Sequence, residues 1–205
     1  MRVEQLVVGA VAGVALSLAA EWRAEWRNVG PGGGGWIQSI LASRHADDTL
    51  LVGCDVGGFY RSDDGGAHYT ISNAGLEDYF IECLAEHPSE PETLYAGCKS
   101  GVYKSTDGGR HWSWLRTGFP PVQEYGYSAM VSKIVLDPSR PETVYAAIGQ
   151  PRENRGGQGA IYKSSDGGRT WRQTVRAGQL ERDLNITDLS VNAKEPGRLL
   201  IATPK

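Results

Sequence analysis

SDDGGAHY at Ser62–Tyr69 occurs in two further versions, STDGGRHW at Ser105–Trp112 and SSDGGRTW at Ser164–Trp171. All three follow the pattern Ser-x-Asp-Gly-Gly-x-x-aromatic, and we call each copy an Asp-Gly-Gly turn. Successive copies begin 43 and 59 residues apart. Spacings in this range are expected for propeller blades and are too long for leucine-rich or hexapeptide solenoids. The pattern therefore predicts a repeat protein built from radial blades.

A second repeated stretch accompanies these turns. HPSEPETLYAGC begins at His87, DPSRPETVYAAI at Asp137 and NAKEPGRLLIAT at Asn192, while RHADDTLLVGCD at Arg44 is a looser copy. We call the first part of each copy a Pro loop. Apolar and β-branched runs bounded by Pro and Gly predict four strands per unit. In the second unit these runs are Ile81–Leu84, Thr93–Cys98, Val102–Lys104 and Trp112–Leu115.

We therefore expect an all-β fold: a β-propeller of four-stranded antiparallel blades, incomplete, with about three blades and part of a fourth. Turn chemistry explains the residue types of the Asp-Gly-Gly turns, because Asp accepts nearby backbone N–H groups and glycine supplies positive φ. A calcium loop would need further carboxylates, which only Asp63 beside Asp64 offers, so no metal is assigned. The residues expected to build the turns are Ser62, Asp64, Gly66, Ser105, Asp107, Gly109, Trp112, Ser164, Asp166, Gly168 and Trp171.

The three turns closely resemble the Asp-box, or BNR repeat, shared by sialidases, sortilin-type receptors, photosystem II assembly factors and xyloglucanase-type glycosidases. This resemblance implies a β-propeller and no particular activity. A sialidase would also need an arginine cluster, introduced by an Arg-Ile-Pro-like segment before the first turn. No such segment precedes Ser62, so a sialidase ranks third among the candidate functions.

The N-terminus differs from the repeats. Leu6–Ala20 is an uninterrupted run of apolar and small residues that follows Arg2. Such a run is short for a membrane-spanning helix. Residues 1–20 are therefore predicted to be a signal peptide and residues 21–205 a partial propeller, in a secreted or periplasmic protein. An uncleaved anchor is the alternative, because Glu4 lies where a signal peptide should be positive.

Composition narrows the partners. A formal net charge of −3, with no basic run, lacks the electrostatic footprint of nucleic-acid binding. Cys54 and Cys98 occupy equivalent places in successive units and are expected to be small buried hydrophobes. Cys83 and Cys98 lie on adjoining strands of one hairpin, and a disulfide between them is the open alternative, subject to a Cα separation within about 7 Å. The four histidines are expected at the surface, and no cofactor is implied.

Antiparallel strands place the loops at two ends of each blade. The Pro loops and Asp-Gly-Gly turns are expected at one end, while Asp55–Gly58, Lys99–Gly101, Gly149–Ala160 and the blade-to-blade connections share the other. Function is expected at this second end, because loops on a rigid scaffold usually carry it. Its carboxylates are Asp55, Glu77, Asp78, Glu124 and Asp183. Phe80 lies nearby, and Tyr79, Tyr125 and Tyr127 are predicted to bind a polysaccharide or glycan; the alternative is that all of these are solvated loop residues.

WRNVGPGGGGWIQSI from Trp26, followed by CDVGGFYR from Cys54, closely resembles the opening of xyloglucanase-type endoglucanases. The resemblance is specific from Trp26 to about Arg61 and continues to Lys205 only through the generic repeat. In that family the Asp of the second segment is one of two catalytic carboxylates, and the matching residue here is Asp55. An Asx-type turn is the competing interpretation of Asp55.

Glycoside hydrolysis needs two carboxyl groups, about 6.5–9.5 Å apart when the configuration inverts. In-chain partners for Asp55 would be Glu77, Asp78 or Asp183. The sequence ends within a fourth unit, so we expect a fragment, or half of an assembly closed by a second chain or a missing C-terminal part. The first-ranked function is thus a xyloglucanase-like glycoside hydrolase fragment, inactive alone. A non-catalytic propeller that binds protein or glycan ranks second.

Overall fold

The computed structural model describes residues 31, 35–121, 130–149, 159–175, 186–195 and 197–203. Every regular element within them is a β-strand, arranged as three four-stranded antiparallel sheets and one two-stranded sheet. The predicted all-β, incomplete propeller is therefore confirmed. The signal peptide predicted at residues 1–20 lies outside the described residues.

Each four-stranded sheet is one blade, with its strands in sequence order from the inside outward. Blade 1 comprises β1 (Ile37–Ala42), β2 (Leu50–Cys54), β3 (Phe59–Ser62) and β4 (Thr70–Ile71). Blade 2 comprises β5 (Ile81–Glu86), β6 (Leu94–Cys98), β7 (Gly101–Ser105) and β8 (Ser113–Leu115). Blade 3 comprises β9 (Val131–Leu136), β10 (Val144–Ile148), β11 (Ala160–Ser164) and β12 (Arg172–Val175). The half-blade comprises β13 (Asp188–Val191) and β14 (Leu199–Ala202).

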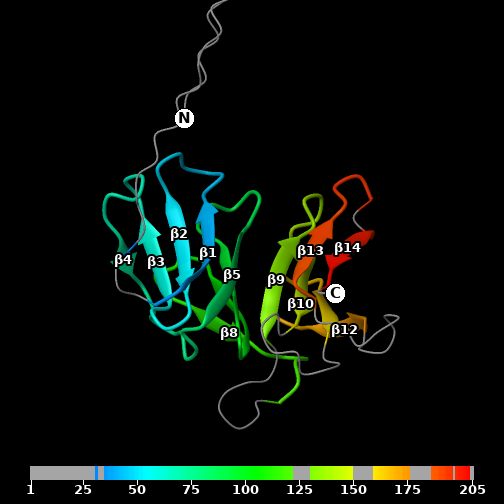
Figure 1. Cartoon of the computed structure of the whole chain (residues 1–205). Coiled ribbons are helices and arrows are strands. Elements are labelled where there is room, and N and C mark those ends of the chain that lie inside the picture. The colour runs from blue at the N-terminus through cyan, green and yellow to red at the C-terminus, as the bar shows by residue number, and fades with distance from the viewer. Residues whose placement is uncertain are drawn as a thin grey trace, which may run out of the picture.

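The innermost strands bring successive blades together. β1 contacts β5, β5 contacts β9, and β9 contacts β13, so these four strands follow one another across the middle of the molecule (Figure 1). β1, β5 and β9 each carry an irregularity in their ladder near the start of the strand, at Gln38, Glu82 and Ser132. Bulges of this kind redirect side chains and increase local twist.

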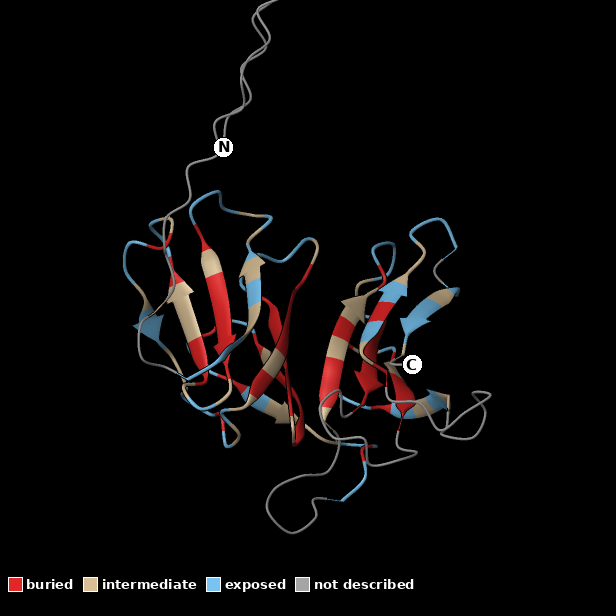
Figure 2. Cartoon of the chain, viewed as in Figure 1, coloured by how far each residue is buried: buried red, intermediate tan, exposed pale blue. Residues whose placement is uncertain are grey.

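Alternation along the strands builds the core between blades. On β6, Leu94 and Cys98 pack in a cluster with blade 1 residues, whereas Tyr95 packs in a cluster with blade 3 residues. On β10, Val144 belongs to the cluster with blade 2 and Tyr145 to the cluster with the half-blade. Successive side chains of a strand point to opposite faces, so each central blade is buried on both sides. In Figure 2 the strand β5 is mostly buried, whereas β4 and β14 are mostly exposed.

The Asp-Gly-Gly turns have the same hydrogen bonds in all three blades. The Ser hydroxyl donates to the Asp carboxylate and accepts the N–H of the second glycine at 2.8–2.9 Å. The Asp carboxylate accepts the backbone N–H four residues on, at 2.9 Å. The first glycine donates its N–H to a carbonyl of the Pro loop in the same blade, as Gly108 does to Glu92 at 2.9 Å. The two kinds of loop therefore meet at one end of the blade.

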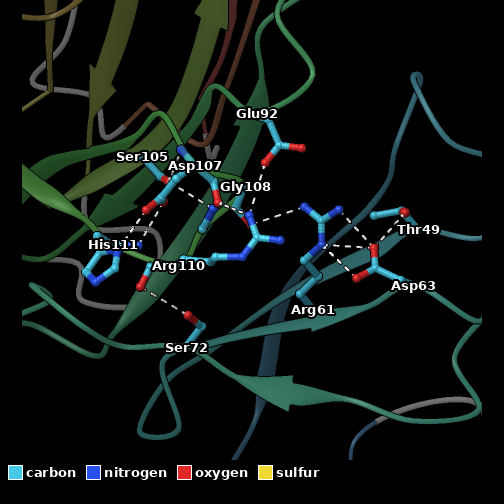
Figure 3. Close-up of polar contacts among 11 residues, drawn as sticks. Thr49, Arg61, Asp63, Ser72, Glu92, Ser105, Asp107, Gly108, Arg110 and His111 are labelled. Atoms are coloured by element: carbon cyan, nitrogen blue, oxygen red, sulfur yellow. Dashed lines mark hydrogen bonds and ion pairs between the residues drawn. The ribbon is translucent and has the colours of Figure 1, made fainter.

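These turns also join neighbouring blades. Nη1 of Arg61 on β3 donates to the carbonyl oxygen of Gly108 at 3.1 Å, and Nζ of Lys104 on β7 donates to that of Gly167 at 3.3 Å. Figure 3 shows Arg61 between Asp63 of its own blade and Gly108 of blade 2. Trp112 packs edge-to-face on Phe59 of blade 1, with ring centroids 5.0 Å apart. The closing aromatic residue thus packs against the preceding blade as well as its own.

The structure decides one open alternative and corrects one expectation. The ladder pairs Cys83 with Gly97 and Cys98 with Ile81, and all three cysteines are free and buried. Cys83 faces blade 3 and Cys98 faces blade 1, so no Cys83–Cys98 disulfide forms. The expectation that all histidines lie at the surface is wrong for His87, which is 4% exposed. Its Nδ1 accepts the N–H groups of the Pro loop that follows it.

Candidate functional site

Asp55 immediately follows β2, at the blade end opposite the Asp-Gly-Gly turns. Its backbone N–H donates to the carbonyl of Trp36 at 3.0 Å, and its Oδ1 accepts the N–H of Trp36 at 2.8 Å. No described residue donates a hydrogen bond to Oδ2. Asp55 is half-buried. One oxygen of the carboxylate is therefore fixed, while the other remains available for a ligand.

Local geometry holds this carboxylate in place. Gly58 has φ of 76° and its carbonyl accepts the N–H of Cys54, which closes a tight turn around Asp55. Asn73 supports the turn, because its Oδ1 accepts the N–H of Phe59 and its Nδ2 donates to the carbonyl of Gly57. Burial, together with the nearby Asp55 carboxylate, raises the pKa of the Cys54 thiol. This turn is consistent with Asp55 as a catalytic carboxylate and with Asp55 as the side chain of an Asx-type turn.

The glycine before Trp36 is required by the same contact. Gly35 has φ of 94°, and a Cβ atom there would lie 2.3 Å from Oδ1 of Asp55 and 2.5 Å from Cγ2 of Val56. A backbone without side chains can approach other groups this closely. Gly35 thus lets the two segments of the family resemblance meet in space.

Exposed apolar residues lie next to Asp55 in the sequence and across the β1–β2 pair. Trp36 is 69% exposed, Val56 67% and Ile37 41%. Trp36 was not predicted to be a functional residue. The sequence hint was its position directly after the glycine run, but only the pairing of β1 with β2 shows that Trp36 lies opposite Asp55.

The in-chain partners expected for Asp55 have other environments. Asp78 uses Oδ1 to accept the N–H of Phe80 at 3.0 Å and Oδ2 to accept that of Ser100 at 2.7 Å, so it anchors the connection before β5 to the turn between β6 and β7. Glu77 is exposed. Tyr79 is 48% exposed at the same blade end. The remaining predicted residues of this end, Glu124, Tyr125, Tyr127 and Asp183, lie outside the described residues.

Two hollows lie along the innermost strands, and neither is lined by Asp55. The larger, of about 530 Å³, is lined by polar and apolar residues of β1, β5, β9 and the start of β13. Its polar lining includes Gln38, Glu82, Lys133 and Asp188. Nζ of Lys133 lies 3.1 Å from Oδ1 of Asp188 and links blade 3 to the half-blade. The second hollow, of about 340 Å³, is lined by Leu41, Glu86 and other residues nearer the Pro loops. Glu82 and Asp188 were not predicted from the sequence, because only the packing of the innermost strands brings them to one hollow.

Within the described part of the chain, no group of three or more His, Cys, Asp or Glu side chains is placed to hold a metal ion. The same residues contain no helix with the length and apolar character needed to cross a membrane.

The fold and the site define a class, the β-propeller proteins. The chain is 27% identical over 186 residues to the xyloglucanase of Hypocrea jecorina, a match that covers 83% of this chain and 21% of that protein. An ancestral GH74 enzyme superposes with a TM-score of 0.69 at 18% identity, over 88% of this chain and 23% of the enzyme. The GH74 enzyme of Niastella koreensis gives 0.61 at 22% identity, over 80% and 24%. No protein-family model matches.

These likenesses support a xyloglucanase-like β-propeller. The chain spans about a fifth of the length of the curated relative that it matches.

Proposed function

We propose that this chain is the part of a secreted, xyloglucanase-like glycoside hydrolase that binds a β-glucan-type polysaccharide and supplies Asp55 as one of two catalytic carboxylates. The single observation that carries the proposal is the juxtaposition of the two segments of the family resemblance. They lie apart in sequence, and hydrogen bonds between Trp36 and Asp55 bring them together in space. The 27% identity to a xyloglucanase supports the substrate class.

Asp55 suits a role in acid–base catalysis because it lies on a rigid turn with one oxygen held. The second carboxylate is the missing element. Asp78 is committed to two backbone N–H groups, and Glu77 is exposed with no hydrogen bond to its carboxylate among the described residues. A general acid and a general base are both needed for hydrolysis with inversion. The chain by itself is therefore expected to bind the polysaccharide without cleaving it.

Affinity electrophoresis tests the proposal. The full chain is run through native gels that contain tamarind xyloglucan, a mixed-linkage β-glucan or dextran. Retardation is expected with xyloglucan and β-glucan and not with the α-linked dextran. A reducing-sugar assay on the same xyloglucan should give no turnover. Equal mobility in all three gels would overturn the proposed function.

A non-catalytic binding propeller is the second candidate, and the use of Asp78 as a structural anchor favours it. Replacement of Asp55 by Asn separates the two. A catalytic carboxylate acts mainly in the transition state, so D55N should lose at most about twofold in affinity for xyloglucan. A binding propeller that depends on Asp55 to hold sugar hydroxyls should lose about tenfold or more. The control is Asp47→Asn, which alters an exposed carboxylate at the opposite end of blade 1.

A further inference from the structure

We propose that Trp36 is a stacking platform for a pyranose ring and that it forms one binding subsite together with the carboxylate of Asp55. This inference rests on the proposed polysaccharide function and adds a residue that determines where a sugar ring sits.

Strand register places the two side chains together. β1 pairs with β2 through Ile37 and Cys54, and the next pair outward is Trp36 with Asp55. Directly opposed residues of an antiparallel pair have their side chains on the same face, with Cβ atoms about 4.5–5.5 Å apart. The backbone N–H of Trp36 binds the Asp55 carboxylate instead of the Asp55 carbonyl. The carboxylate is therefore tied to the residue whose indole is proposed to hold the sugar.

Exposure distinguishes Trp36 from the other described tryptophans. Trp112 and Trp171 are 4% and 5% exposed in the packing between blades, and Trp114 is half-buried against Tyr103. Trp36 is 69% exposed. An exposed indole of this size offers a large apolar face, and covering it with a ligand removes that face from water.

The Trp36 face suits a flat, amphipathic ligand. Val56, next to Asp55, and Ile37, next to Trp36, are exposed apolar residues as well. The free oxygen of Asp55 offers a hydrogen-bond acceptor at the edge of the same surface. A pyranose ring has apolar C–H groups on its faces and hydroxyl donors around its rim, so it matches both features. The uncharged β-linked glucose backbone of a β-glucan fits this combination.

The test uses the full chain and a defined probe, a xyloglucan oligosaccharide with a cellotetraose backbone, in isothermal titration calorimetry. Trp36→Ala is expected to weaken binding about tenfold, and Trp36→Phe, which keeps a smaller aromatic face, about threefold or less. Leu200→Ala is the control, because Leu200 is exposed to a similar degree, 66%, on β14 of the half-blade. It should leave binding unchanged.

A second readout reports directly on Trp36. The oligosaccharide should protect the wild-type protein from acrylamide quenching of tryptophan fluorescence, and this protection should disappear in Trp36→Phe. If the wild type binds the oligosaccharide and the Kd of Trp36→Ala is within twofold of the wild-type Kd, the stacking role of Trp36 is overturned and the proposed function still holds. No wild-type binding at millimolar oligosaccharide would overturn both.

Discussion

Gly109 shows why the second glycine of an Asp-Gly-Gly turn resists substitution. It has φ of 89°, a region that side chains disfavour, and a Cβ atom there would lie 2.3 Å from Cε1 of Phe59 in blade 1. Gly168 repeats the arrangement with φ of 92° and a contact of 2.7 Å to Leu115 of blade 2. Glycine is therefore required at this position for two reasons: the positive φ of the turn and the close packing against the preceding blade.

We expect Gly109→Ala to lower the free energy of unfolding by about 2–4 kcal/mol, from backbone strain and from the clash with the Phe59 ring. Urea denaturation followed by tryptophan fluorescence measures this change. The control is Gly197→Ala, because a Cβ atom at Gly197 meets nothing within 4 Å and the change should stay within about 0.5 kcal/mol. Equal destabilisation of both variants would contradict the argument.

The turn aspartates make stability depend on pH. The pKa of Asp107 is lowered to about 2, mainly by the backbone N–H of His111 and against the effect of partial burial, with further contributions from the His111 ring and the Ser105 hydroxyl. The folded-state pKa is below the unfolded value of about 3.9, so this contribution is present above pH 4 and is lost as the pH falls toward 2.

Asp107→Asn should therefore reduce the slope of stability against pH between pH 4 and pH 2. Urea midpoints measured across this range for the wild type and the variant give the two slopes. Identical slopes would show that Asp107 titrates alike in the folded and unfolded states. Asp47→Asn serves as the control, since no hydrogen bond or ion pair of Asp47 is found among the described residues.

At the scale of elements, contacts between blades depend on a basic residue at one fixed position in each repeat. The residue just before the turn serine is a cation in each blade: Arg61, Lys104 and Lys163. The first two reach a glycine carbonyl of the next Asp-Gly-Gly turn. Lys163 lies over the ring of Tyr145 at 5.5 Å, as Lys104 lies over that of Tyr95 at 5.2 Å. Among the described residues Lys163 donates no hydrogen bond to a glycine carbonyl, so this pair isolates the carbonyl contact.

Lys104→Met is expected to destabilise the protein by about 1 kcal/mol more than Lys163→Met, because both lose an interaction with a tyrosine ring and Lys104 also loses its bond to Gly167. The value lies below the usual range for charged hydrogen bonds because the site is only partly buried. Equilibrium unfolding of the two variants under the same conditions provides the comparison. A difference near zero would show that the contact contributes nothing net.

At the scale of the whole molecule, the sequence predicted the architecture well because it repeats. Turn residues and apolar runs recur in each unit, so an ambiguous strand boundary in one copy can be read from the next. The ends of β5 to β8 lie within two residues of the predicted runs. The Trp36 platform could not be predicted, since it depends on the register of β1 against β2. The facing of Cys83 and Cys98 depends on the irregularity at Glu82, which no local pattern reveals.

Burial between blades predicts an order of hydrogen exchange. β6 and β10 each have strand neighbours on both sides and packed clusters on both faces, so their amides should exchange most slowly. β4 and β14 are exposed edge strands and should exchange fastest. Mass spectrometry of peptides from the exchanged chain measures the order. Protection of β14 equal to that of β10 would contradict it.

The cation-to-carbonyl contacts between blades all run in one direction, from an earlier blade to the turn of the next. A chain that emerges from the ribosome N-terminus first therefore presents each finished cation before the turn that will receive it. We therefore expect each new blade to close onto a blade that has already folded. Pulling from the C-terminal end should, by the same logic, peel the blades away one at a time.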